Sequence, residues 1–147
     1  DMEKYCDAVM EKSEKLYPSK MYDLAEQSYT GTLGQNANGL GRLIVDERYK
    51  QGGNLFSTGS FGHCGHTGTS FFFNREKDMY AVILTNAKRH LWIKNNCQYG
   101  YDYKVICKMR ENIHNKILED INNWRQTNNI KSMGGNFAKP GCRLFVI

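Results

Sequence analysis

Two short apolar runs separated by a polar break are the feature of this sequence that most constrains the fold. The runs are Phe71–Phe73 and Met79–Leu84, and each has the length of a strand rather than of a helix. The residues between them, 74–78, are polar and charged, as expected of a turn that joins two paired strands. The sequence therefore predicts a β-hairpin whose strands cover residues 69–75 and 79–86.

A segment with glycine at every third position leads into this hairpin. Such glycines allow the backbone to approach another group closely or to adopt a positive φ. The segment presents His63 and Cys64 at the edge of a strand that we expect over about residues 60–65.

A family resemblance covers residues 61–90, which read FGHCGHTGTSFFFNREKDMYAVILTNAKRH. This segment resembles the C-terminal signature of the serine β-lactamase and penicillin-binding-protein-like family, class C β-lactamases in particular. In that family a strand carries Lys/His-Thr/Ser-Gly, Thr-Gly-Thr follows, and a hairpin ends in Leu-Thr-Asn. The matching positions here are 63–65, 67–69 and 84–86. The sequence departs from the pattern at Cys64, because the family usually has a hydroxyl residue there.

A Gly-Leu-Gly sequence begins another predicted strand, residues 39–45. The β-lactamase-like family has a Gly-Leu-Gly strand at this distance before its Lys/His-Thr-Gly strand. The resemblance therefore extends upstream, across a loop that we expect over residues 46–60.

Two segments have the apolar periodicity of helices. In residues 2–16, apolar side chains recur on one face, Asp1 can cap the N-terminus and Pro18 ends the pattern. Residues 104–125 have the clearer pattern, an apolar stripe that we expect to pack on a sheet. The members of this stripe recur at three- or four-residue steps: Val105, Met109, Ile113, Ile117, Ile121 and Trp124.

Together these segments predict an α+β fold. The resemblance implies the C-terminal part of a β-lactamase/transpeptidase-like fold, an antiparallel sheet with helices packed on it. We expect this β-lactamase-like portion to cover residues 1–127 and a tail to cover residues 128–147. The tail ends in apolar residues, 144–147, which can either dock on a partner or add an edge strand.

The resemblance also implies roles for the glycine-rich segment. His63 takes the position of the family's Lys or His, lines the substrate cleft, and polarises or hydrogen-bonds a bound acyl substrate. The backbone N–H of His66 is an expected oxyanion-hole donor, a group worth roughly 3–4 kcal/mol in such reactions. The expected substrate-binding residues are Cys64, Gly65, Thr67 and Gly68.

The nucleophile of this chemistry does not occur in the sequence. The family uses a serine in Ser-x-x-Lys, assisted by Tyr/Ser-x-Asn, and neither motif is found among the 147 residues. The expected partner is therefore the remaining N-terminal part of the domain, from the same precursor or a separate subunit. The expected substrate is a small acyl compound or peptide. The alternative is an inactive β-lactamase-like pseudoenzyme that serves as a structural or assembly subunit.

Composition and spacing argue against other classes of protein. The net charge of +5 comes from 20 scattered basic and 15 acidic residues, which does not favour a nucleic-acid partner. No apolar run reaches the ~20 residues that span a bilayer, so no membrane span is predicted. The five cysteines form no CxxC pair. A metal site of His63, Cys64 and His66 with Cys97 or Cys107 would lack a regular zinc spacing, so neither metal nor another cofactor is expected.

The resemblance leaves the compartment open. Bacterial relatives work outside the cytoplasm and a eukaryotic relative resides in mitochondria. We expect an extracytoplasmic location if the source is bacterial and a mitochondrial one if it is eukaryotic.

Overall fold

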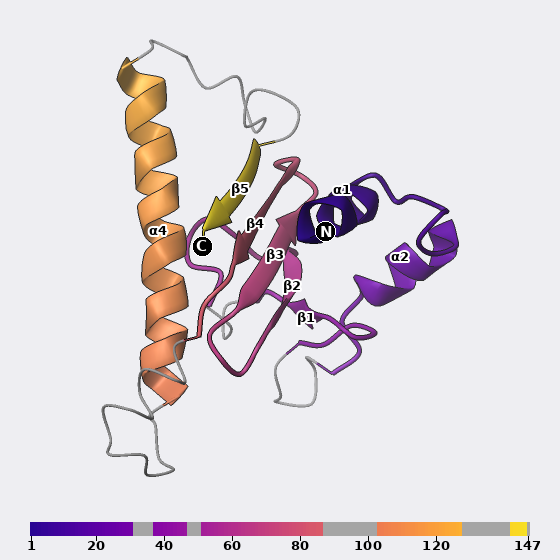
Figure 1. The fold of residues 1–147 in the computed structure, drawn as a ribbon. Coiled ribbons are helices and arrows are strands. Elements are labelled where there is room, and N and C mark those ends of the chain that lie inside the picture. The colour runs from indigo at the N-terminus through magenta and orange to yellow at the C-terminus, as the bar shows by residue number, and fades with distance from the viewer. Residues whose placement is uncertain (31–36, 47–50, 87–102, 128–141, 147) are drawn as a thin grey trace.

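The computed structural model describes residues 1–30, 37–46, 51–86, 103–127 and 142–146. They form a five-stranded sheet with helices on both of its faces, which confirms the α+β class (Figure 1). In chain order the elements are α1 (Met2–Met10), α2 (Ser19–Ala25), β1 (Leu43–Ile44), β2 (Phe61–Cys64), β3 (Ser70–Asn74), β4 (Met79–Ile83), α4 (Tyr103–Thr127) and β5 (Cys142–Val146).

The strands lie in the sheet in the order in which they occur in the chain. β1 to β4 pair antiparallel, and β3 and β4 form the predicted hairpin, with Ser70 opposite Ile83 and Asn74 opposite Met79. Both hairpin strands are shorter at their ends than the sequence predicted. β5 pairs parallel with β4, so the chain adds an edge strand there, one of the two arrangements expected of the tail. The rest of the tail, residues 128–141 and 147, lies outside the described residues.

The strand predicted over 39–45 is wrong for its first half. The backbone N–H of Gly39 donates to the carbonyl of Arg42 at 2.8 Å, and Gly41 has a φ of +68°. Asn38 forms a bridge to Leu43 across this reversal. Glycine at the start of the expected strand therefore supplies a turn, and β1 begins only after it.

The helix predicted over 2–16 is wrong beyond Met10. Lys12 has a φ of +50°, a left-handed conformation that an α-helix cannot continue. The chain then reverses before α2 begins. The Tyr22 hydroxyl on α2 donates to the carbonyl of Ser13 at 2.7 Å and so holds the two short helices together.

One face of the sheet packs against α1. Cys6 and Val9 of the helix are fully buried in a cluster with Phe61, Phe73, Tyr80 and Val82 of the strands. The Phe61 and Phe73 rings stack with centroids 5.1 Å apart. The Tyr80 hydroxyl donates to the Asp7 carboxylate at 2.9 Å, which ties the helix to β4.

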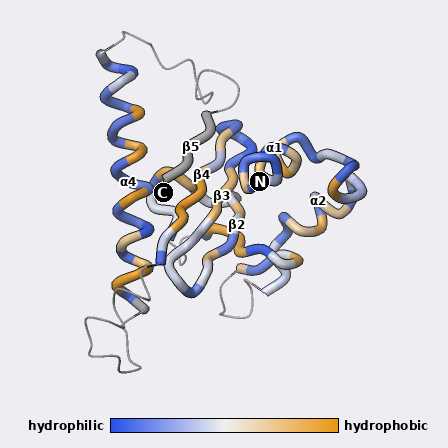
Figure 2. The backbone as a smooth tube through the Cα atoms, in the orientation of Figure 1, coloured by the Kyte–Doolittle hydropathy of each residue, from blue (hydrophilic) through white to orange (hydrophobic). Residues whose placement is uncertain are grey.

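The opposite face of the sheet packs against α4. Successive strand residues point to opposite faces, so Phe72 enters this second core while Phe73 enters the first. The apolar colouring of the central strands in Figure 2 reflects this burial from both sides, and all five residues of β4 are buried. The α4 residues packed on this face are Ile117, Leu118 and Ile121.

α4 has the predicted extent, but the stripe predicted for its first half is wrong. Val105 is 53 % exposed, whereas Ile106 is buried, and Arg110 and His114 are fully buried one and two turns further on. Trp124, at the other end of the predicted stripe, is 55 % exposed. The helix is rotated relative to the expectation because Arg110 and His114 find backbone carbonyls to bond inside the protein.

Candidate functional site

Three segments that are far apart in the sequence meet at one end of the sheet. Leu43 pairs with Gly62, so the turn before β1 lies beside the end of β2. Ser70 pairs with Ile83, so residues 84–86 lie beside the turn that connects β2 to β3. These three segments are the ones that carry the resemblance described above.

His63 and Cys64 point to opposite faces of the sheet. His63 is exposed and lies on the α1 face, where its ring stacks on that of Phe71 with centroids 6.4 Å apart. Cys64 is half-buried and packs against the core on the α4 face. The two neighbours therefore have different surroundings, and of the two only His63 is exposed.

Residues 65–69 form a tight turn between β2 and β3. The N–H of Gly65 donates to the carbonyl of Thr69 at 2.7 Å, and the N–H of Gly68 donates to the carbonyl of Gly65 at 3.2 Å. Gly68 has a φ of +96°, a conformation that side chains rarely adopt. His66 is exposed and Thr67 half-buried in this turn. All six residues expected in the site are thus contiguous on β2 and the turn.

Arg110 of α4 holds this turn from the α4 side. Its Nε donates to the carbonyl of Gly68 at 3.0 Å, and its Nη2 donates to the carbonyl of Thr69 at 3.1 Å and to that of Gly65. Its Nη1 donates to the side-chain oxygen of Gln51. A guanidinium has five donors in a rigid plane, so one side chain can satisfy several buried carbonyls at once. Arg110 therefore positions the peptide units around His66.

His114 lies one turn beyond Arg110 in the same buried layer. A carbonyl can only accept, so the Nδ1–H of the ring donates to the backbone oxygen of Gln51, 2.9 Å away. The ring meets Phe56 and Phe72 edge-on, and this burial lowers the pKa of His114 to about 4. Its Nε2 makes no hydrogen bond to any residue in the described ranges. The imidazole is therefore neutral at physiological pH and supports the structure between the 51–56 loop and α4.

Nothing in the helix pattern marked Arg110 and His114 as buried, because their partners lie about 40–60 residues away along the chain. The one signal in the sequence is that Ile106, Arg110 and His114 follow one another at steps of four residues, which places all three on one face of the helix.

The described part of the chain presents neither a cluster of metal ligands nor a helix that could span a membrane. Within it, no group of three or more His, Cys, Asp or Glu residues has the proximity needed to hold a metal ion. Cys6, Cys64 and Cys107 take part in no disulfide within the described residues, and Cys97 lies outside them. No described helix combines the length and apolar character that crossing a bilayer requires.

Comparison with protein-family models, with curated proteins and with solved structures finds no match to this chain.

Proposed function

We propose that this chain is the C-terminal part of a β-lactamase-like serine hydrolase, which cleaves an amide or ester through an acyl-enzyme. The serine, its lysine and the Tyr-x-Asn motif would come from residues outside this sequence. One observation carries the proposal: the three segments that resemble the family, although separated along the chain, lie together at one end of the sheet.

In this proposal His63 acts from the α1 side of β2, where its side chain is exposed. From there its imidazole reaches a substrate bound over the α1 face, polarising or hydrogen-bonding the acyl group. The backbone N–H of His66 is the oxyanion donor, and Arg110 is the residue that positions it by bonding the flanking carbonyls. The substrate contact inferred for Cys64 stays a prediction, and its thiol packs on the other side of the strand.

The test uses the assembled enzyme, comprising this chain together with the portion that carries the serine. A fluorophosphonate or penicillin probe is expected to label that serine, and the assembly is expected to hydrolyse a chromogenic ester. His63→Ala should lower the turnover by roughly 100-fold or more, the usual scale for a lost acid–base group. The matched control is His66→Ala, which removes an exposed side chain but keeps the backbone N–H, and so should retain activity. Equal activity of wild type and His63→Ala would remove His63 from the mechanism.

The second candidate is a β-lactamase-like pseudoenzyme that serves as a structural or assembly subunit. It is favoured by Cys64, which replaces a hydroxyl residue and has its side chain packed on the α4-side core instead of on the His63 face. The same probes separate the two candidates, because a folded assembly that takes up neither fluorophosphonate nor penicillin fits only the pseudoenzyme.

A further inference from the structure

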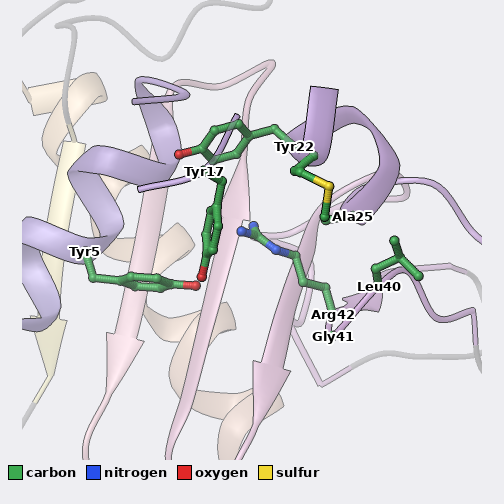
Figure 3. A pocket seen from close by; sticks show the side chains of 8 residues that line it. Tyr5, Tyr17, Tyr22, Ala25, Leu40, Gly41 and Arg42 are labelled. Carbon is green, nitrogen blue, oxygen red and sulfur yellow. The ribbon is translucent and has the colours of Figure 1, made fainter. Parts of the chain in front are cut away.

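A pocket of about 210 Å³ lies on the α1 side of the sheet, and none of the residues expected in the acyl-transfer site lines it (Figure 3). α1, α2 and the turn before β1 enclose it, and neither His63 nor His66 is among its lining residues. Three tyrosines contribute to its wall. The lining residues are Tyr5, Tyr17, Met21, Tyr22, Ala25, Leu40, Gly41 and Arg42.

Among the described residues that line the pocket, Arg42 is the one that carries a charge, and it is only 7 % exposed. Its guanidinium lies over the ring of Phe61, 4.9 Å from the centroid, and 5.8 Å from that of Phe73. Its Nη1 nitrogen is buried and makes no hydrogen bond to any residue that the structure describes. A buried donor without a partner costs free energy, so the guanidinium of Arg42 is left with unmet hydrogen-bonding capacity.

The carboxylate of Glu26, which lies beside Arg42, is already engaged by another residue. Glu26 accepts two hydrogen bonds of 2.6 Å from Arg75, while Arg42 Nη1 stays 3.9 Å from Glu26 Oε1. Two guanidinium groups thus share one carboxylate, which leaves one positive charge in excess within this group of three. A bound monoanion would balance that charge, whereas a dianion would again leave an unpaired charge in a partly buried site.

The tyrosines complete a site for an anion on an apolar body. Figure 3 shows the side chains of Tyr5 and Tyr17 with their hydroxyl oxygens toward one another and the Arg42 guanidinium directed toward the Tyr17 ring. Burial raises the pKa of Tyr5, so its hydroxyl keeps its proton and can donate. The Tyr22 hydroxyl is bonded to Ser13, so this residue offers its ring to the pocket. The described part of the wall is therefore largely aromatic, and it carries hydroxyl donors and the cation of Arg42.

We propose that this pocket binds a small carboxylic acid with an apolar body about the size of one ring, its carboxylate paired with Arg42. The volume is sufficient, because a cavity of ~150 Å³ lined by apolar residues already admits benzene. The residues expected in the acyl-transfer site do not line the pocket, so binding here does not need the missing serine.

The test is a titration of the full chain with benzoate, followed by backbone amide NMR. Saturable shifts are expected at Ala25, Leu40 and Gly41, with binding at least tenfold tighter than that of benzamide, the neutral isostere. Arg42→Met is expected to abolish the preference for benzoate. If benzamide binds as tightly as benzoate, or if no shift saturates, the proposal is overturned.

A pair of variants on α2 keeps the test decisive if Arg42→Met does not fold. Met21 and Leu24 are similarly exposed, at 43 % and 41 %, but only Met21 lines the pocket. Met21→Glu places a negative charge at the mouth and should weaken benzoate binding at least tenfold, while Leu24→Glu should leave it unchanged. Equal effects of the two substitutions would show that the carboxylate does not bind in this pocket.

Discussion

Arg75, in the turn between β3 and β4, donates two hydrogen bonds of 2.6 Å to the carboxylate of Glu26. The same guanidinium donates to the carbonyls of Met10, at 2.9 Å, and Val9, at 3.0 Å, at the end of α1. One side chain therefore fastens both N-terminal helices to the sheet. Because the pair is largely removed from water, each charge depends on the other for its solvation.

Glu26→Gln should lower the free energy of unfolding by about 2–3 kcal/mol, somewhat less than the loss of one partner from a fully buried pair. The reason is that two guanidinium groups then lack their anion. Urea denaturation measures the change. The control is Asp23→Asn, which breaks the exposed pair between Lys12 and Asp23 and should leave the unfolding midpoint in place. Similar shifts in the two variants would contradict the assigned role of Glu26.

Arg110→Met should destabilise the protein by about 3 kcal/mol or more, because several buried carbonyls lose their donor together. Amide hydrogen exchange should rise in the 65–69 turn more than in α1. Lys116→Met, on the exposed side of the same helix, is the control and should change neither the midpoint nor the exchange. Protection of the turn that survives in Arg110→Met would show that the arginine does not hold it.

His114 should make the protein less stable as the pH falls from 6.5 to 4. Its pKa is about 4 in the folded protein because of burial, against an ordinary value of 6.5, so in this window only the unfolded chain takes up the proton. The accumulated loss is roughly 3 kcal/mol over the full window. His114→Asn keeps an N–H donor but has no proton to gain, so its unfolding free energy should depend less on pH. Urea titrations of both proteins across this range measure the difference, and parallel curves would contradict the prediction.

Gly65→Ala should be destabilising by about 1–3 kcal/mol, as expected of overpacking, since the new Cβ would lie 2.0 Å from Oγ1 of Thr69. The double variant with Thr69→Ala removes that oxygen and should recover most of the loss. The double variant with Thr69→Val keeps an atom in the same place and should not recover it. Thermal unfolding of the four proteins checks this, and equal behaviour of the two double variants would rule out the steric explanation.

The parts of the fold that the sequence predicted well are those encoded locally. The β3–β4 hairpin follows from two apolar runs and the polar break between them, and the extent of α4 follows from its periodicity. The buried face of α4 could not be predicted in the same way. Arg110 reads as a surface residue until the carbonyls of Gly65, Gly68 and Thr69 are placed beside it, and those residues lie on another element.

The two candidate sites differ in the same way, because one lies in a single segment of the sequence and the other is assembled from several. His63 and the turn after it stand in one continuous segment, so a motif was sufficient to mark them. The pocket around Arg42 draws on α1, α2 and the turn before β1. These come together because the chain leaves the predicted helix early, near Lys12, and reverses before α2. Arg42 itself lies in a segment predicted to be a strand, and nothing in the sequence indicated that its Nη1 would be buried without a hydrogen bond to the described residues.

The hydrogen bonds from Arg110 to the 65–69 turn can form only after α4 has been synthesised. Thr69 and Arg110 are 41 residues apart, which a ribosome adding about 5–20 residues per second covers in roughly 2–8 seconds. An isolated hairpin closes in about 1–10 µs, so β3 and β4 can pair long before α4 emerges. For those seconds Phe72 and its neighbours lack the helix that later covers them. The nascent chain therefore passes through a stage in which the α4-side face of the sheet is exposed to chaperones or to other chains.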